Sequence, residues 1–295
     1  KRKLFFTISV ILILLVPVGM GVFHAKDGKA LNYSLEFMGG TSTNVTFNDD
    51  MSIDDLDSQV KPVVQEVTGD ANIQISKVAD SNAVIIKTRS LSLDEREELN
   101  QKLVDSFGVD DSKITAESIS STVSSEMRRD AIVAVLIATI CMLLYIWFRF
   151  KDVRFASSAV LALLHDVMVV LAFYALSRIS VGNTFIACML TIVGYSINAT
   201  IVIFDRIREN LKSAGKKADL KELVNMSITQ TLTRSIYTSF TTFITIFVVF
   251  VMGVSSIREF ALPIMVGIVC GAYSSVCITG ALWYVMKTKL GKSTK

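Results

Sequence analysis

Six long runs of apolar residues, separated by shorter polar joints, set the pattern of the chain. They cover residues 4–23, 131–148, 155–176, 183–204, 235–254 and 260–286. Each run is close to the roughly 17–25 residues that an α-helix needs to cross the hydrocarbon core of a bilayer. We therefore predict a polytopic α-helical membrane protein with six transmembrane helices.

The first run follows Lys1, Arg2 and Lys3, as the apolar part of a signal peptide follows a basic start. It is long enough to span a membrane, however, and no small-residue cleavage site ends it cleanly. We interpret residues 1–23 as the first transmembrane helix, in which Pro17 is a tolerated kink.

Residues 24–127 break the apolar pattern and have the periodicity of a small α+β domain. Stretches with the alternation of strands and stretches with the spacing of helices follow one another there. The second helical stretch begins with a capping box, Ser92-x-x-Glu95. The ferredoxin-like, split βαβ arrangement has the same order of elements, which is strand 41–47, helix 52–67, strands 71–78 and 83–88, helix 92–107 and strand 113–119.

Charge separates the same two parts of the chain. Of the 295 residues, 51% are apolar, which is high for a soluble domain. The block 24–127 carries 9 Lys and Arg against 19 Asp and Glu. Basic residues elsewhere gather in joints that fall on one side of the membrane, at residues 1–3, 149–154, 206–221 and after 287. By the positive-inside rule, we expect both termini in the cytoplasm and the acidic domain outside it.

These patterns predict four parts, namely a first transmembrane helix at 1–23, an extracytoplasmic domain at 24–127, a five-helix bundle at 128–290 and a cytoplasmic tail at 291–295. We find no Cys/His cluster with metal-ligand spacing, no glycine-rich phosphate loop and no nucleophile elbow. We therefore predict no enzyme activity, no cofactor and no metal. The cysteines fall in apolar runs and are expected to act as small apolar residues.

Two polar residues, His165 and Asp166, lie near the middle of the third run. A carboxylate at mid-bilayer costs at least about 2.5–3.5 kcal/mol, so it should face protein or water. One interpretation is a proton-titrating group, because burial disfavours the charged form of a carboxyl group. The other is a neutral side chain that hydrogen-bonds a neighbouring helix.

The fourth and fifth runs carry further polar residues. Arg234 stands at the start of the fifth run, and a stripe of hydroxyls continues from it through Thr238, Thr241 and Thr245. The arginine is either a partner for a carboxylate or an interface anchor that snorkels. On the fourth run, Asn198 is either functional or a helix–helix contact, and it shares a face with Thr191, Tyr195 and Val202, with Ala199 just beside it.

Several long motifs resemble the SecF family of protein-export membrane subunits, and the resemblance covers nearly the whole chain. The motifs are Glu-Phe-Met-Gly-Gly-Thr at 36–41, Leu-His-Asp-Val at 164–167, Gly-Tyr-Ser-Ile-Asn at 194–198, Phe-Asp-Arg-Ile-Arg-Glu-Asn at 204–210, Thr-Arg-Ser-Ile-Tyr-Thr-Ser at 233–239, Ile-Arg-Glu-Phe-Ala at 257–261 and Gly-Ala-Tyr-Ser-Ser at 271–275.

The resemblance implies a proton-driven member of the resistance–nodulation–division superfamily in the bacterial cytoplasmic membrane. Its partners would be SecD, which supplies six more helices, the SecYEG translocon, an unfolded preprotein and membrane lipid, with no nucleic acid. The family's functional residues include an arginine that matches Arg234 and a carboxylate in the fourth helix. By resemblance, Asp205 and Arg206 mark the cytoplasmic end of that helix.

The chain departs from the family at that carboxylate. The family has Asn-Asp-Thr where this chain has Asn198-Ala199-Thr200. Two explanations stay open, a deliberate Asp-to-Ala substitution that impairs proton coupling and a natural variant. Two rival functions also stay open: a small-molecule efflux transporter of the same superfamily, and a scaffold of the translocon that transports nothing.

Overall fold

The computed structural model of the protein describes residues 2–27, 30–70, 73–78, 81–150, 152–214, 219–253 and 255–289. The chain forms two compact units, a helical unit of Lys1–Asn32 and Val133–Lys295 and a sheet unit of Tyr33–Ile132. The sheet unit thus begins and ends later than the predicted domain at 24–127. Positions 71–72 of the predicted strand and the predicted tail at 291–295 lie outside the described residues.

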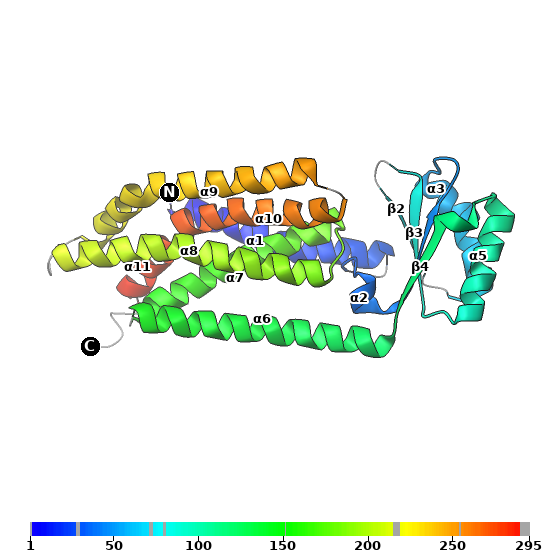
Figure 1. Cartoon of the computed structure of the whole chain (residues 1–295). Helices are drawn as coiled ribbons and strands as arrows, with labels where there is room; N and C mark the ends of the chain where they lie inside the picture. Colours follow the sequence, from blue (N-terminus) through cyan, green and yellow to red (C-terminus); the bar gives the residue numbers. More distant parts are fainter. Residues whose placement is uncertain are drawn as a thin grey trace. The chain divides into compact units, whose positions relative to one another are not determined.

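In its described residues, the sheet unit has one four-stranded antiparallel sheet in the order β2-β3-β1-β4 (Figure 1). Helical segments connect β1 to β2 and β3 to β4, in the order that the sequence predicts. The elements are α2 (Leu35–Met38), β1 (Gly40–Thr46), α3 (Ile53–Asp55), the π-helical turn η1 (Leu56–Val60), α4 (Lys61–Thr68), β2 (Gln74–Lys77), β3 (Ala83–Thr88), α5 (Leu93–Phe107), the 3₁₀ turn η2 (Asp111–Lys113) and β4 (Ile114–Ile119).

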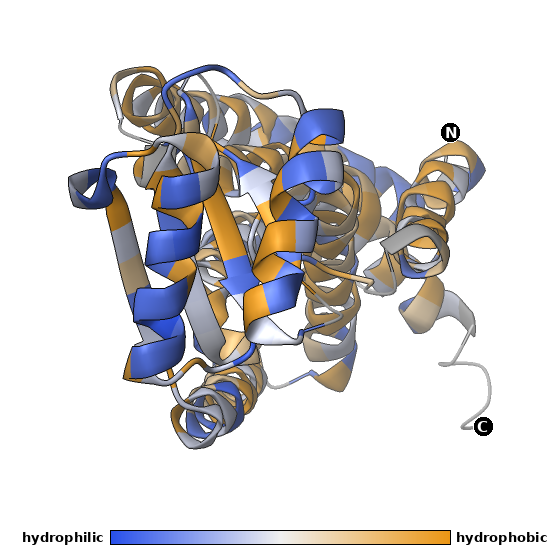
Figure 2. Cartoon of the chain, turned by 90° about the vertical axis from the view of Figure 1, so that its right-hand side faces the viewer, coloured by the Kyte–Doolittle hydropathy of each residue, from blue (hydrophilic) through white to orange (hydrophobic). Residues whose placement is uncertain are grey.

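The core of the sheet unit forms where the apolar side of the sheet meets the apolar faces of its helices. Val60, Val64, Ile86, Leu99 and Leu103 are all 0% exposed there. The outward faces of the helices are hydrophilic, as Figure 2 shows. Each helix therefore buries its apolar stripe, and the alternating strands bury the apolar face of the sheet.

The start of α5 confirms the predicted capping box. Ser92 Oγ accepts a hydrogen bond from the Glu95 backbone N–H at 3.2 Å, and the Glu95 carboxylate accepts one from the Ser92 backbone N–H at 2.8 Å. Arg89 also bonds this carboxylate and, together with the cap, lowers the pKa of Glu95 to about 2. The cap therefore stays ionised down to acidic pH.

Two glycines lead into β1. Gly40 has φ +114°, and a Cβ at this position would lie 2.2 Å from the Thr88 carbonyl oxygen. Gly39 has φ +69°, with Ser124 Oγ 2.9 Å from the corresponding Cβ position. The Gly39-Gly40 pair therefore needs glycine for its positive φ angles, and Gly40 also needs it because β3 lies so close.

Within the described part of the chain, six helices are long and apolar enough to cross a membrane, as the sequence predicts. The chain is a multi-pass membrane protein. The helices are α1 (Arg2–Asp27), α6 (Ser121–Phe150), α7 (Val153–Ser177), α8 (Asn183–Ser213), α9 (Leu220–Met252) and a sixth made of α10 (Ser255–Ser274), the π-helical turn η3 (Ser275–Thr279) and α11 (Gly280–Lys289).

Helix α9 begins well before the apolar run at 235–254 that predicted it. Asp219 caps it by accepting a hydrogen bond from the Lys221 backbone N–H at 2.9 Å. Its first turns are amphipathic and bury Leu223, Val224 and Ser227. Arg234 therefore lies inside a long helix, about four turns from its start.

The helices of the helical unit are buried to very different degrees. In α7, α8 and the sixth helix, half or more of the apolar stretch of 18 residues that could span the membrane is buried. The buried share is 6% in α6 and 11% in α9. Helix α6 buries only Ile146 and Phe150 in this unit, where they join an aromatic cluster with Phe155, Phe204 and Trp283. The apolar flanks of α6 and α9 are thus left open in this chain.

Candidate functional site

Helix α8 carries two polar faces that point to different neighbours. Tyr195, Asn198 and Ala199 line a pocket against α9, whereas Ser196 and Thr200 are buried against α7 and the sixth helix. At 3.6 residues per turn, neighbouring positions lie about 100° apart on a helix, so one segment serves both sides.

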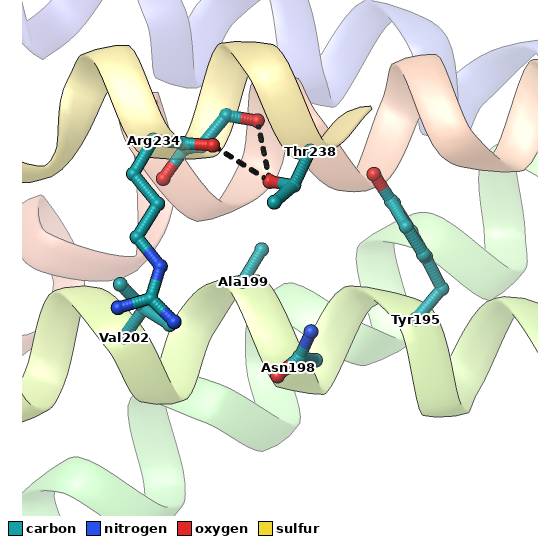
Figure 3. Close-up of a pocket in the computed structure, with 7 residues that line it drawn as sticks. Tyr195, Asn198, Ala199, Val202, Arg234 and Thr238 are labelled. Carbon is teal, nitrogen blue, oxygen red and sulfur yellow. Dashed lines mark hydrogen bonds between the residues drawn. The ribbon is translucent and has the colours of Figure 1, made fainter. Parts of the chain in front are cut away.

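We call the first site the Arg234 pocket (Figure 3). It lies between α8 and α9 and has a volume of about 40 Å³. Arg234 extends from α9 toward Val202, and Tyr195 extends from α8 toward α9. The lining residues are Tyr195, Asn198, Ala199, Val202, Arg234, Ser235 and Thr238. The structure therefore brings together four residues that the sequence singled out, Asn198, Ala199, Arg234 and Thr238.

The hydroxyl stripe on α9 bonds its own helix. Thr238 Oγ1 donates to the carbonyl oxygen of Arg234 at 2.8 Å and to that of Ser235 at 3.1 Å (Figure 3). Thr241 and Thr245 likewise donate to carbonyls four residues earlier, at 2.9 and 3.0 Å. These hydroxyl hydrogens are engaged within the helix, so the stripe offers its oxygens as acceptors and not a row of free donors.

The second site, the Asp166 cluster, surrounds a carboxyl group that is 0% exposed. Asp166 Oδ2 accepts hydrogen bonds from Ser196 Oγ at 2.5 Å and from Ser274 Oγ at 2.7 Å. Asp166 Oδ1 accepts one from Cys270 Sγ at 3.3 Å, and His165 Nδ1 lies 3.0 Å from it. Four groups that can donate therefore converge on one buried carboxyl.

His165 links this cluster to α1. Its side chain is 4% exposed, and its ring lies 6.1 Å from the ring of Tyr273. Tyr273 donates to the Phe5 carbonyl oxygen at 2.9 Å, and its hydroxyl lies 3.3 Å from Ser9 Oγ. His165 Nε2 is buried. The ring thus contacts Asp166 through Nδ1 and leaves Nε2 without a hydrogen-bond partner among the described residues.

Small residues let the sixth helix approach α8 at this cluster. A Cβ on Gly271 would lie 3.3 Å from Ser196 Cβ, and one on Gly267 would lie 2.4 Å from the Ile192 side chain. Close contact of this kind is typical of helix pairs in membranes. The π-helical turn η3 begins directly after Ser274, and Ser275 Oγ lies 3.2 Å from Thr200 Oγ1. Such turns within helices often occur at functional sites.

Charged side chains gather where α8 leaves its apolar part. Asp205 pairs with Arg149 at 2.9 Å. Arg206 pairs with Glu209 at 2.6 Å and donates to Gln230 Oε1 at 2.6 Å. Asp205 and Arg206 thus tie the end of α8 to α6 and α9, and they take no part in either polar site.

Asp166 does not line the Arg234 pocket, although sequence reasoning placed both in one proton-coupling set. Sequence reasoning also missed the partners of Asp166. Cys270 was expected to act as a small apolar residue, but it donates to the carboxyl. Cys270 and Ser274 stand four residues apart in an apolar run, a spacing that places them on one helix face and could have indicated a polar contact.

His165, Asp166 and Cys270 also hold a nitrogen, an oxygen and a sulfur within 4.8 Å of one another. Zinc accepts ligands of these kinds. His165 Nδ1 and Cys270 Sγ already contact Asp166 Oδ1, and two serines bond Oδ2, so these atoms form a hydrogen-bonded network. We assign no metal to it.

Comparison with known proteins places these sites in a family. The model of the SecD/SecF C-terminal family of protein export membrane proteins matches residues 99–289. Protein translocase subunit SecF of Petrotoga mobilis is 35% identical and is aligned over 100% of this chain and 97% of its own length.

Longer relatives match as well. Protein translocase subunit SecDF of Bacillus subtilis is 33% identical over 97% of this chain, which spans 37% of that protein. The crystal structure of SecDF from Thermus thermophilus, a translocon-associated membrane protein, matches with a TM-score of 0.80 and 34% identity. That match covers 98% of this chain and 38% of the crystallised one. By sequence and by structure, the chain belongs to the SecD/SecF family of protein export membrane proteins, and it is similar to SecF subunits.

Proposed function

We propose that the chain is a proton-driven accessory subunit of the Sec protein translocase, and that it pairs with SecD to promote the export of unfolded preproteins. Its relatives are named protein translocase subunits, which supports a role in Sec translocation. The relatives named SecDF are fused proteins of which this chain spans little more than a third. A six-helix partner of the SecD type is therefore the natural complement of this chain.

Exposed polar residues on α8 and α9 support the proposal that a partner protein covers these helices. Asn198 and Arg234 are exposed on this chain although they lie within membrane-length helices. Lipid offers no hydrogen bonds to such groups, so polar residues at this depth face protein or a water-filled cavity. Helices α8 and α9 would then meet the partner's helices around the Arg234 pocket, in the membrane beside SecYEG.

The observation that carries proton coupling is the Asp166 cluster. A carboxyl group that is 0% exposed accepts hydrogen bonds from Ser196, Ser274 and Cys270 and has a histidine beside it. Protonation would remove the charge that holds these donors from α8 and the sixth helix. The packing of both helices would then depend on the proton, which is what a coupled transporter requires.

The proton-motive force is large enough for this step. A charge that crosses 100 mV gains about 2.3 kcal/mol, so at about 150 mV one proton supplies about 3.5 kcal/mol. Moving a two-state element from 1:99 to 99:1 takes about 5.5 kcal/mol. Two protons per cycle therefore suffice, and the motion would pass to the sheet unit.

In this proposal the sheet unit is a ferredoxin-like domain outside the cytoplasmic membrane, and both termini lie in the cytoplasm. Its acidic composition, against basic joints elsewhere, supports that orientation. The domain acts as a binding or lever element and the chain is not an enzyme, since no catalytic constellation is recognisable in the sequence.

Two rivals fit less well. A scaffold of the translocon would need no fully buried carboxyl with converging donors. A small-molecule efflux pump of the superfamily is less well supported, because the relatives are named protein translocase subunits.

Vesicles that contain this chain, SecD and SecYEG test the proposal by proton conductance and by proton-dependent preprotein export. We expect Asp166→Asn and Arg234→Leu to abolish both, because each removes a group whose charge the cycle uses. We expect Ala199→Asp to raise both, since it supplies the carboxylate that the family has at this position. Thr245→Val is the matched control, because this hydroxyl bonds only its own helix among the described residues.

Assembly with SecD is measured in parallel by co-purification, so that loss of coupling is separated from loss of the complex. Export that is unchanged in the Arg234→Leu and Asp166→Asn variants would refute proton coupling through these groups. Export without any conductance in any variant would favour the scaffold.

A further inference from the structure

The sixth helix contains a π-helical turn, η3, directly beside the Asp166 cluster. The turn covers Ser275–Thr279 and lies between α10 and α11. A π-helical turn is rare and contains about one residue more than an α-helical turn. No proline or glycine within the turn forces it, since its residues are Ser-Val-Cys-Ile-Thr. Contacts with the neighbouring helices must therefore hold it.

Hydroxyl groups make the contacts that hold η3. Ser275 Oγ donates to the Ser196 carbonyl oxygen at 3.5 Å and lies 3.2 Å from Thr200 Oγ1, both on α8. Thr279 Oγ1 donates to the Ser274 carbonyl oxygen, five residues earlier, at 3.1 Å. Hydroxyls in α-helices bond the carbonyl three or four residues earlier, as those of α9 do. The Thr279 bond is therefore specific to the π-helical turn.

Ser274, the residue before η3, has two acceptors within reach. Its Oγ donates to Asp166 Oδ2 at 2.7 Å and lies 3.3 Å from the Gly271 carbonyl oxygen on its own helix. Ser196 donates to the same carboxyl oxygen at 2.5 Å. Hydrogen bonds to a carboxylate are stronger than those to a neutral carboxyl, and a proton on Oδ2 would meet both hydroxyl hydrogens. A protonated Asp166 would therefore release Ser274 to the Gly271 carbonyl.

The helix after η3 contains a buried group that its present position does not satisfy. Trp283 on α11 is 0% exposed, and its indole Nε1 is buried without a hydrogen-bond partner among the described residues. Its ring stacks on Phe155, with the ring centroids 4.9 Å apart. An unpaired buried donor is costly. The π-helical turn thus keeps α11 in a rotation that is not optimal for this side chain.

Loss of the extra residue from η3 would rotate α11. One residue corresponds to about 100° around an α-helix and about 1.5 Å along it. With Ser274 in place, Leu282 would move to the angular position of Trp283, and Trp283 would move to that of Tyr284. Trp283 would then leave a fully buried position for a half-buried one.

We propose that Ser274 and η3 form a switch that the proton on Asp166 operates. This inference rests on the proposed function, in which Asp166 takes up and releases a proton. Without the proton, Asp166 holds Ser274 and the π-helical turn persists. With it, Ser274 turns to the Gly271 carbonyl, η3 becomes α-helical and α11 rotates. Ser274 is thus a positioning residue that couples the occupancy of Asp166 to the end of the sixth helix.

The groups that face Asp166 limit what else can respond to pH. The polar side chains around Asp166 and His165 are Cys270, Tyr273 and Ser274 from the sixth helix, Ser196 from α8 and Ser9 from α1. Apart from Asp166, only His165, Cys270 and Tyr273 among them titrate. A pH response that disappears in Asp166→Asn therefore belongs to the carboxyl.

The tryptophans of the chain allow a direct test. The chain has two, and Trp147 is 57% exposed on α6, so Trp147→Phe leaves Trp283 as the only reporter. The full chain with this change is placed in lipid nanodiscs. Quenching of Trp283 fluorescence is measured with acrylamide and with brominated acyl chains as the pH is lowered. We expect quenching to rise at low pH, because Trp283 leaves its buried position.

Further variants in this background fix the switch in opposite states. Asp166→Asn and Ser274→Ala should show high quenching at every pH, because each lacks the bond between a carboxylate and Ser274. Deletion of Cys277 removes one residue from η3 and leaves Trp283 in its place, so quenching should stay low at every pH. Ser158→Ala is the matched control and should keep the full response, because this buried hydroxyl bonds only its own helix among the described residues.

Circular dichroism checks that each variant is folded. Quenching that does not change with pH in the protein without these variants would overturn the inference, as would a response that persists in Asp166→Asn or in the Cys277 deletion. Proton conductance is measured on the same variants in vesicles with SecD and SecYEG. Conductance that Asp166→Asn abolishes, together with a Trp283 signal that never changes, would overturn the switch and leave the proposed function standing. Conductance that Asp166→Asn leaves unchanged would refute the proposed function, and the switch would fall with it.

Discussion

Asp166 is held by donors from two neighbouring helices, so its removal should cost far more than the removal of any one donor. In Asp166→Leu, the hydroxyls of Ser196 and Ser274 lose their acceptor in a buried site. We expect a loss of about 2–6 kcal/mol in unfolding free energy, because each buried hydroxyl left without a partner costs about 1–3 kcal/mol. Ser274→Ala removes one hydrogen bond and should cost about 0.5–1.5 kcal/mol.

Thermal unfolding in detergent, followed by circular dichroism, measures both changes. Thr245→Val serves as the reference and should stay within about 0.5 kcal/mol, because its hydroxyl bonds only the Thr241 carbonyl among the described residues. An Asp166→Leu protein as stable as this reference would mean that the cluster contributes nothing to folding.

The same residue shows what a sequence can predict at this scale. A carboxyl in the middle of an apolar run is conspicuous by itself, so Asp166 was recognisable without any structure. Its partners were not, because serine and cysteine are ordinary residues of membrane helices and their pairing depends on the rotation and register of two other helices. The Arg234 pocket was easier, since one face of α8 follows directly from helical spacing.

At the scale of elements, the contact between α8 and the sixth helix depends on Gly267. A Cβ at this position would lie 2.4 Å from the Cγ1 and Cδ1 atoms of Ile192, a side chain that is only 1% exposed and has little freedom to move. We expect Gly267→Ala to destabilise the helical unit by about 1–3 kcal/mol, the usual cost of overpacking.

Gly194 on α8 is the matched control. A Cβ there would have no neighbour within 4 Å, so Gly194→Ala should be neutral or should stabilise the helix by up to about 1 kcal/mol. The two substitutions add the same methyl group with opposite expected signs in the same unfolding experiment. Equal effects would show that intrinsic helix propensity, and not the packing of the two helices, decides the outcome.

Element boundaries were predictable only where polarity changes sharply. The beginning of α9 was missed because its first turns are amphipathic, and a run of mixed residues between two apolar segments resembles a loop. The strands and helices of the sheet unit were predicted closely, since the alternation of the strands, the capping box at Ser92 and the helical spacing are local signals. The π-helical turn η3 has no comparable local signal in the residues of Ser275–Thr279.

At the scale of the whole molecule, charge predicts on which side of the membrane each unit lies. The acidic residues concentrate in the sheet unit, and the basic residues concentrate in joints of the helical unit. A single added cysteine can report each side, because a membrane-impermeant maleimide reacts only with thiols that face its own compartment. Suitable exposed positions are Glu97 on α5 and Ser213 at the end of α8.

We expect intact cells to label Glu97→Cys and to leave Ser213→Cys unlabelled until the membrane is opened. The unmodified chain is the control. Its Cys188 and Cys270 are buried, and Cys141 is exposed only on the apolar flank of α6, where no water is available to form the reactive thiolate. Labelling of Ser213→Cys in intact cells, with Glu97→Cys protected, would invert the topology. The sheet unit would then lie in the cytoplasm, where it could not assist a preprotein that emerges on the other side.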